Sequence, residues 1–255
     1  MTSSLPAVDT RARSGGGPQA VLLDMDGTLV DTEGFWWDAE VEVFGALGHD
    51  LADEHRQVVV GGPMTRSAGY LIEVTGADIT MDELRVLLNA GFLRRLDRGV
   101  PLMPGARRLL TELAAHGVPT ALVSASHRVV IDRMLASLGA EHFALTVAGD
   151  ELERTKPHPD PYLTAARGLG AAPERCVAVE DTATGVASAE AAGCRVVAVP
   201  SVAPIPAVAG RTVVDSLEKV DLALLRSVVA APLPPSSAAR PGRDVSHLGN
   251  GVTAD

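Results

Sequence analysis

The first residues that could do chemistry form the segment DMDGTL, residues 24–29. Two carboxylates spaced two positions apart point the same way from an extended segment, so Asp24 and Asp26 would share one face. A carboxylate can act as a covalent nucleophile and form an acyl phosphate, which makes this pair a candidate for phosphoryl transfer. Asp-Gly is also a common turn and aspartates often cap helices, so the pair alone leaves both interpretations open.

Three later segments carry reactive or charged groups at the end of an apolar run or in the loop beyond it. They are Ser124-Ala125-Ser126, Thr155-Lys156-Pro157 and Glu180-Asp181. Ser124 begins a stretch whose backbone N–H groups could hold an anion, or it caps a helix. Lys156 and Lys219 are the two lysines of a chain that otherwise uses arginine, which argues against an ordinary surface role for Lys156. Together, the four segments favour a shared site.

The elements that would position these groups alternate along the chain. Short apolar runs rich in β-branched residues predict buried strands over Ala20–Leu23, Thr120–Val123, Ala144–Val147, Cys176–Val179, Arg195–Val199 and Thr212–Val214. Amphipathic stretches predict helices over Ala106–Ala115, Arg128–Leu138, Pro161–Leu169, Ala183–Ala192 and Ser216–Leu225. The alternation predicts an α/β fold with a Rossmann-like parallel sheet. Ligands bind at the carboxyl ends of such strands, so the four segments would meet at one edge.

One stretch interrupts this alternation. Residues 33–101 show helical periodicity and no strand pattern, which predicts an all-helical insertion. The sheet domain would then consist of residues 19–32 and 102–230. Residues 1–18 and 231–255 are rich in Gly, Ser, Pro and other polar residues, and they are predicted to be disordered arms.

The predicted site brings four acids together: Asp24, Asp26, Glu180 and Asp181. Two carboxylates ~6 Å apart repel each other by about 3 kcal/mol at an effective dielectric constant of ~20. A cation is therefore expected, and hard oxygen ligands without a His or Cys cluster favour Mg²⁺. Mg²⁺ bridges carboxylates to substrate phosphates, whose charge Lys156 would also offset.

The overall composition narrows the class of partner. The formal charge is −10, which argues against binding to nucleic acid or anionic membranes and leaves a small phosphorylated metabolite as the expected partner. Cys176 and Cys194 lie in apolar runs and are predicted to be free buried thiols. The sequence shows no signal peptide and no run of ~18 apolar residues, so we expect a cytoplasmic protein, as a monomer or weak homodimer.

On these motifs and their order, the chain resembles the phosphatase and phosphomutase branch of the haloacid dehalogenase (HAD) superfamily, over about residues 20–225. The resemblance implies the HAD fold with a helical cap, and Asp24 as the nucleophile that becomes phosphoaspartate. It implies that Asp26 is the general acid and base and that its backbone carbonyl binds Mg²⁺. Lys156 would pair with the nucleophile and the phosphate.

The same resemblance gives roles to the remaining site residues. Thr28, Ser124 and the N–H of Ala125 would hold the transferring phosphoryl group. Asp181 would bind Mg²⁺, with Glu180 binding directly or through water. Relatives that cleave carbon–halogen or carbon–phosphorus bonds lack the second aspartate of the first motif, so its presence here favours phosphoryl transfer.

The expected function is a Mg²⁺-dependent phosphatase for a sugar or polyol phosphate, with a β-phosphoglucomutase and a phosphoglycolate phosphatase as alternatives. In β-phosphoglucomutases a histidine after the first motif holds back hydrolysis of the phosphoenzyme. This chain has Trp36 at that position, which favours water as the acceptor. A non-enzymatic phosphate sensor is not favoured, because a binder needs no nucleophile and acid together.

Two features of the predicted cap bear on the substrate. Phe35, Trp36 and Trp37 are expected to form the core of the cap hinge rather than a substrate platform. Arg66 ends the segment GGPMTR, residues 61–66, which resembles the loop that faces the site in this family. Arg66 would meet a hydroxyl or anionic group of the substrate, or it would lie in solvent.

Overall fold

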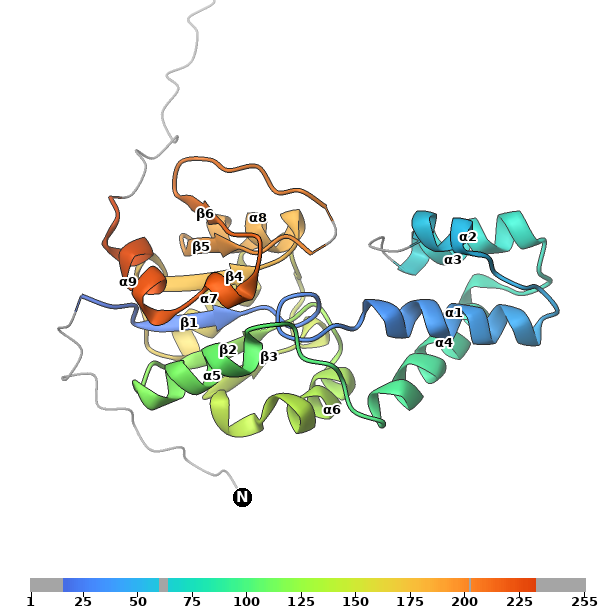
Figure 1. Ribbon diagram of the computed structural model, residues 1–255, viewed down its shortest axis with the longest axis horizontal. Coiled ribbons are helices and arrows are strands. Elements are labelled where there is room, and N and C mark those ends of the chain that lie inside the picture. The colour runs from blue at the N-terminus through green and yellow to red at the C-terminus, as the bar shows by residue number, and fades with distance from the viewer. Residues whose placement is uncertain (1–15, 60–63, 202, 233–255) are drawn as a thin grey trace, which may run out of the picture.

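A parallel β-sheet forms the centre of the molecule, and a group of helices extends to one side of it (Figure 1). The computed structural model describes residues 16–59, 64–201 and 203–232. In these residues six strands pair in the order β3-β2-β1-β4-β5-β6, and every pair is parallel. The strands are β1 (Ala20–Leu23), β2 (Thr120–Val123), β3 (Leu145–Val147), β4 (Cys176–Glu180), β5 (Arg195–Ala198) and β6 (Arg211–Val213). The predicted α/β fold is confirmed.

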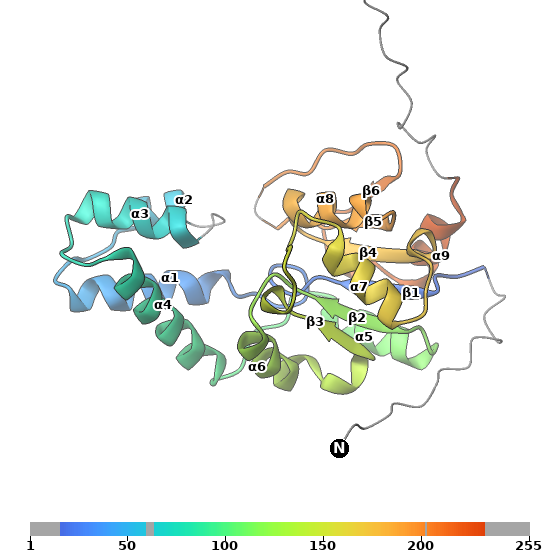
Figure 2. The ribbon, with the colours of Figure 1, turned by 180° about the vertical axis from the view of Figure 1, so that it is seen from behind.

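The sheet is buried on both faces because its residues alternate between two apolar clusters. On β1, Val21 and Leu23 belong to one cluster, and Ala20 and Leu22 belong to the other. Helices α5, α6 and α9 contribute to the first cluster, and α7 and α8 contribute to the second (Figures 1 and 2). These helices are α5 (Ala106–Ala115), α6 (Arg128–Leu138), α7 (Asp160–Gly168), α8 (Ala183–Ala191) and α9 (Leu222–Ala230).

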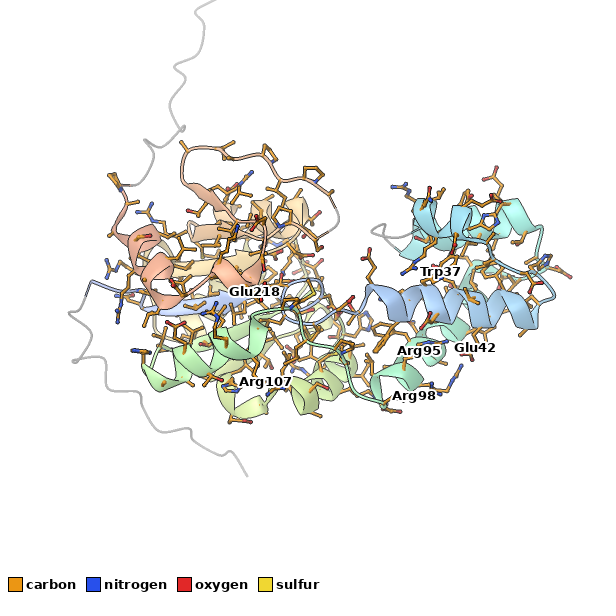
Figure 3. All side chains as sticks on the ribbon, in the orientation of Figure 1. Trp37, Glu42, Arg95, Arg98, Arg107 and Glu218 are labelled. Carbon is orange, nitrogen blue, oxygen red and sulfur yellow. The ribbon has the colours of Figure 1, made fainter. Side chains whose placement is uncertain are left out.

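The chain between β1 and α5 is helical, as predicted, and packs partly on itself. Its helices are α1 (Glu33–Ala46), α2 (Asp53–Val59), α3 (Met64–Thr75) and α4 (Met81–Leu96). The Trp36 ring of α1 stacks on Phe92 of α4, with ring centroids 4.1 Å apart. Glu42 of α1 forms ion pairs with Arg94 and Arg95 of α4, and Figure 3 shows Glu42 and Arg95 between the two helices. These contacts fix α1 and α4 as one unit.

The segments that enter and leave this helical region lie side by side. The N–H of Asp31 donates to the carbonyl of Pro101 (2.9 Å), and the N–H of Met103 donates to the carbonyl of Leu29 (2.9 Å). Phe92, near the end of α4, belongs to the same apolar cluster as one face of the sheet. The helical region is therefore attached at its base to the sheet.

One predicted helix, Ser216–Leu225, is wrong. The structure has a 3-10 turn at Leu217–Lys219, and α9 begins only after it. The Ser216 side chain caps the turn, while the carboxylate of Asp221 caps α9 by accepting from a backbone N–H three residues ahead (2.7 Å). The two caps divide the segment. The other predicted strands and helices begin and end within one residue of the structure's bounds.

Short 3-10 turns also occur at Ala140–His142, Gly149–Glu151 and Pro173–Arg175. The predicted arms fall mainly on residues 1–15 and 233–255, which lie outside the described residues. Among the described helices, none combines the length and the apolar character needed to cross a membrane.

Candidate active site

Three acidic residues meet at the carboxyl ends of the two central strands. The strands on one side of β1 follow in the order β2, β3, and those on the other side follow in the order β4, β5, β6. The boundary between β1 and β4 is therefore the topological switch point, where open α/β sheets bind ligands. Asp24 follows β1, while Glu180 ends β4 and Asp181 follows it. Leu23 pairs with Val179, so the acids leave the sheet at about the same level. All three are buried.

Lys156 reaches the same edge from the loop before α7. Its ammonium group donates to Oδ1 of Asp24 (2.7 Å) and Oε1 of Glu180 (2.6 Å). It also donates to the carbonyl of Val123, at the end of β2 (2.8 Å). Burial alone would lower the pKa of Lys156, but the charges of Asp24 and Glu180 outweigh it and raise that pKa above its usual value. Lys156 is thus a fixed, buried cation beside Asp24.

The carboxylate of Glu180 is surrounded by hydrogen-bond donors. Its Oε1 accepts from the ammonium of Lys156 and from the hydroxyl of Tyr162 (2.6 Å). Its Oε2 accepts from the backbone N–H of Asp181 (3.2 Å) and the hydroxyl of Thr182 (3.4 Å). With both oxygens occupied, Glu180 holds the ammonium group of Lys156 in position.

The start of α8 lies directly against Glu180. Thr182 caps the helix by accepting from the N–H of Gly185 (3.1 Å). A Cβ added to Gly185 would lie 1.9 Å from Oε1 of Glu180, so no side chain fits there. The missing side chain lets the positive end of the helix approach this carboxylate.

Asp181 is positioned by residues from two other segments. Its Oδ2 accepts from the hydroxyl of Ser201 (2.5 Å), and its Oδ1 accepts from the hydroxyl of Thr28 (3.4 Å). Gly27 has a φ of 82° and lies so close that a Cβ would stand 2.1 Å from Oδ2. Burial raises the pKa of Asp181 to about 6; the hydrogen bond from Ser201 opposes this rise, and the charge of Glu180 adds to it.

The three buried carboxylates suit a divalent cation. One oxygen of each, from Asp24, Glu180 and Asp181, lies within 4.8 Å of the others. Oδ2 of Asp24 is buried without a hydrogen-bond partner among the described residues. Burial and the charge of Glu180 raise the pKa of Asp24 well above its usual value, against the opposing effect of Lys156. Lys156 balances one of the three negative charges, and a divalent cation would balance the other two. Hard carboxylate oxygens fit Mg²⁺.

The carboxylate of Asp26 lies outside this set and faces three hydroxyl groups. Its Oδ1 accepts from Thr32 (3.0 Å), while its Oδ2 accepts from Ser124 (3.2 Å) and Ser126 (2.8 Å). The backbone carbonyl of Asp26, the atom that the family resemblance gives as a ligand, accepts no hydrogen bond from the described residues. The donors fix the direction of a half-buried carboxyl group at this edge.

The remaining predicted site residues divide into two groups. Thr28 and Ser124 are buried at the edge, and Ala125 follows Ser124 with a backbone N–H that has no partner in the described part of the chain. Arg66 is exposed on α3 and does not line the cleft described below. The structure therefore brings together all the predicted residues except Arg66.

Five side chains that orient the acids were missed in the sequence, among them Thr182, which donates to Glu180. Ser126 and Thr32 bind Asp26, and each stands within a motif whose neighbours were selected, so hydroxyl groups near the motifs were an available signal. Tyr162 lies within a helix and Ser201 in a loop, and no local pattern marks either of them. Only the fold brings them to the site.

A cleft of about 630 Å³ lies between the sheet edge and α1. The residues that line it include Asp26, Asp31, Glu33, Trp36, Trp37, Glu40, Val59, Ser67, Met103, Asp181, Thr184 and Ser201. Trp37 is 9% exposed and belongs to the apolar cluster of the helical region, as expected of a core residue. Both tryptophans also line the cleft. The prediction treated a core position and a position facing the substrate as alternatives, whereas Trp37 is part of the core and also borders the cleft.

Comparisons with known proteins agree with this geometry. The family described as "Haloacid dehalogenase-like hydrolase" matches residues 21–199. Hexitol phosphatase A of Escherichia coli (strain K12) is 33% identical over 215 residues, which cover 80% of this chain and 88% of that protein. The bifunctional riboflavin kinase/FMN phosphatase of Arabidopsis thaliana is 34% identical over 183 residues, or 71% of this chain, and the match spans only 48% of that longer protein.

A solved structure extends the similarity to the whole described fold. The structure of a CbbY mutant from Rhodobacter sphaeroides, in complex with xylulose-(1,5)bisphosphate, superposes with a TM-score of 0.68 at 27% sequence identity. The match covers 82% of this chain and 99% of that one, so it includes the sheet and the inserted helices alike.

Proposed function

Because the chain belongs to the haloacid dehalogenase-like hydrolase family and is a phosphoric monoester hydrolase, we propose that it removes phosphate from a small sugar or polyol phosphate. We further propose that it uses Mg²⁺ and forms an aspartyl phosphate on Asp24. The observation that carries this proposal is the buried contact of Lys156 with Asp24, which leaves the other oxygen of Asp24 without a partner. A carboxylate oriented in this way is prepared to attack an electrophile.

In the first step, a carboxylate oxygen of Asp24 attacks the phosphorus atom and forms a new P–O bond. The bond between phosphorus and the leaving oxygen breaks, and the carboxyl group of Asp26 gives its proton to that oxygen. The leaving group therefore departs as a neutral alcohol rather than as an alkoxide. Lys156, the hydroxyl groups of Thr28 and Ser124, and the N–H of Ala125 stabilise the phosphoryl oxygens.

In the second step, water attacks the phosphorus atom of the phosphorylated Asp24. The carboxylate of Asp26 accepts a proton from this water, and the P–O bond to Asp24 breaks. Inorganic phosphate leaves, and both aspartates return to their starting forms. The hydroxyl groups of Thr32 and Ser126 orient the carboxyl group of Asp26 for both proton transfers, while the single donor hydrogen of Ser124 turns to the phosphoryl oxygens.

Asp24, Asp181 and the backbone carbonyl of Asp26 would hold the Mg²⁺ ion, with Glu180 directly or through water. When bound, the ion offsets the charge of the carboxylates and of the substrate phosphate, so that an anion can approach an acidic site. The three carboxylates within reach of one ion and the excess negative charge of the site support this assignment.

The cleft and the relatives support a substrate with a small polar leaving group. The space of about 630 Å³ is in the range of small-molecule sites. Residues 33–101 would then act as the cap that covers the leaving group. The name of hexitol phosphatase A refers to phosphorylated sugar alcohols, which supports polyol phosphates as the first candidates. Trp36 lines the cleft at the position where the mutases have their histidine, and because its indole ring does not titrate, it favours water over a second sugar phosphate as the acceptor.

The test measures release of inorganic phosphate from p-nitrophenyl phosphate and from sorbitol 6-phosphate, with Mg²⁺ and with EDTA. We expect Mg²⁺-dependent release, lowered at least ~10³-fold by Asp24→Asn, because that substitution removes the nucleophile. Asp38→Asn, an exposed acid on α1, serves as the matched control and should retain activity. Equal release by wild type and Asp24→Asn would contradict the proposal. Faster conversion of β-glucose 1-phosphate to glucose 6-phosphate than phosphate release would establish a mutase instead.

A further inference from the structure

One wall of the cleft is a single helical face. Four residues of α1 line it, spaced at i, i+3, i+4 and i+7: Glu33, Trp36, Trp37 and Glu40. This spacing places them on one side of the helix. Thr32, just before α1, binds the carboxylate of Asp26, so the first turn of the helix lies at the reacting end of the cleft. Figure 1 shows α1 running from there away from the sheet.

Glu40 stands at the far end of this face, and Glu33, whose Oε1 is buried without a partner among the described residues, stands at the near end. Glu40 is only 5% exposed, yet its side chain forms no hydrogen bond or ion pair with any described residue. Burial raises the pKa of Glu40 to about 7. Ser67, a polar neighbour on the cleft wall, donates its hydroxyl to the carbonyl of Val59 and does not occupy Glu40.

A buried carboxyl group without a partner destabilises the fold, and such groups concentrate where a ligand supplies the partner. Other acids of the chain have partners: the exposed Glu42 pairs with two arginines, and the buried Glu180 accepts from four donors. Two acids on the α1 wall have no partner among the described residues: Glu33, whose Oε1 is buried, and Glu40, which is 5% exposed and borders the cleft at the end remote from Asp26. The position of Glu40 fits ligand binding better than packing.

The length of the α1 face can be compared with the length of a ligand. Glu33 and Glu40 are seven residues apart, and a helix rises about 1.5 Å per residue, so the wall between them is about 10 Å long. In a linear six-carbon polyol phosphate, eight bonds join the phosphorus atom to the hydroxyl oxygen at the other end. At roughly 1.2 Å per bond, the extended chain is about 10 Å long. Trp36 lies between the two acids and offers an apolar surface for the carbon chain.

We propose that Glu40 is the residue that selects the substrate, and that it binds the hydroxyl groups at the end of a linear polyol phosphate remote from the phosphate. This inference rests on the proposed phosphatase function and adds to it a specificity residue and a substrate length. A carboxyl group accepts hydrogen bonds from adjacent hydroxyls in either protonation state, and its amide analogue retains part of that capacity. An aryl phosphate without hydroxyl groups makes no such contact.

The test compares kcat and KM for sorbitol 6-phosphate and p-nitrophenyl phosphate in wild type, Glu40→Leu, Glu40→Gln and the α1 control Asp38→Asn. We expect Glu40→Leu to lower kcat/KM for sorbitol 6-phosphate at least tenfold, mainly through KM, because the change removes contacts to bound substrate. Glu40→Gln should retain an intermediate value. Both variants should keep p-nitrophenyl phosphate within about threefold of wild type, since that substrate does not reach Glu40.

Other results would overturn the inference. An equal loss for both substrates would mean that Glu40 acts on the fold or the chemistry, and an unchanged KM for the polyol phosphate would mean that it does not touch the substrate. If Glu40→Leu lowered kcat/KM more for glucosamine 6-phosphate than for sorbitol 6-phosphate, the group that Glu40 binds would be an ammonium group rather than a hydroxyl group. If the wild type releases no phosphate from any of these compounds, the proposed function itself fails, which is a distinct outcome.

Discussion

The two lysines of the chain occupy opposite environments. Lys156 is 4% exposed and bonds two buried carboxylates, whereas Lys219 is exposed and pairs with Asp215. Breaking a buried ion pair leaves an uncompensated charge, so we expect Lys156→Met to lower the free energy of unfolding by about 3–5 kcal/mol. Lys219→Met is the control, and it should change the free energy by less than ~1 kcal/mol. Urea denaturation measures both, and equal effects would contradict the structural role of Lys156.

Glu40 predicts a pH-dependent stability. Its pKa is raised from 4.5 to about 7, so between these values the folded state binds more protons than the unfolded state. The free energy of unfolding therefore contains a penalty that grows as pH rises through this window and amounts to about 3 kcal/mol above it. We expect Glu40→Gln to stabilise the protein at pH 8 and to have little effect at pH 4. Urea denaturation at both values measures this, and a stabilisation that is equal at the two would rule out the raised pKa.

At the residue scale, the sequence predicts the groups proposed to react better than the groups that orient them. Asp24, Lys156 and Asp181 stand in short motifs at strand ends, where local pattern and topology agree. Tyr162 and Ser201 act on the same site only because α7 and the segment after β5 fold back to it. Contacts between segments so far apart in the chain leave no periodicity to detect.

The start of α8 shows how one element depends on the absence of a side chain. Gly185→Ala would place a Cβ on the carboxylate of Glu180 and displace either the helix or the acid that holds Lys156. We expect this change to lower phosphatase kcat/KM at least tenfold and to destabilise the fold by about 1–3 kcal/mol, as overpacking does. Gly45→Ala in α1 meets no atom within 4 Å, so it should leave activity unchanged. Thermal unfolding and kinetics of the pair test the contact, and a fully active Gly185→Ala would refute it.

At the element scale, buried strands and amphipathic helices were predictable because both faces of the sheet need apolar residues in fixed periods. The segment after β6 was not, because its apolar residues continue a helical period across two separate caps. Ser216 and Asp221 each end one backbone conformation and start another. In this segment the helix caps at Ser216 and Asp221, rather than the spacing of the apolar residues, determine where the helix begins.

At the scale of the whole molecule, the proposed metal site would link metal binding to folding. The folded protein holds three carboxylates within reach of one ion, and the unfolded chain does not. Mg²⁺ should therefore raise Tm, with a stabilisation of about 2.7 kcal/mol when its concentration is 100 times Kd. Asp181→Asn should abolish most of this rise, while Asp215→Asn, an exposed acid elsewhere, should keep it. Thermal unfolding with Mg²⁺ or with EDTA measures the rise in Tm. The same rise in Asp181→Asn as in wild type would show that Asp181 does not bind the ion.

The paired connections at the base of the helical region have a consequence for how such a protein diversifies. Asp31 and Pro101 are joined by a backbone hydrogen bond, so an insertion of some seventy residues begins and ends at nearly one point. Its length and sequence can change without shifting any strand of the sheet. With the role proposed for residues 33–101, selection can exchange the residues that contact the leaving group, the proposed specificity residue Glu40 included, while the residues at the sheet edge stay the same. In this fold, the residues proposed for substrate recognition and the residues proposed for catalysis lie in different parts of the chain, so each set can change in evolution without the other.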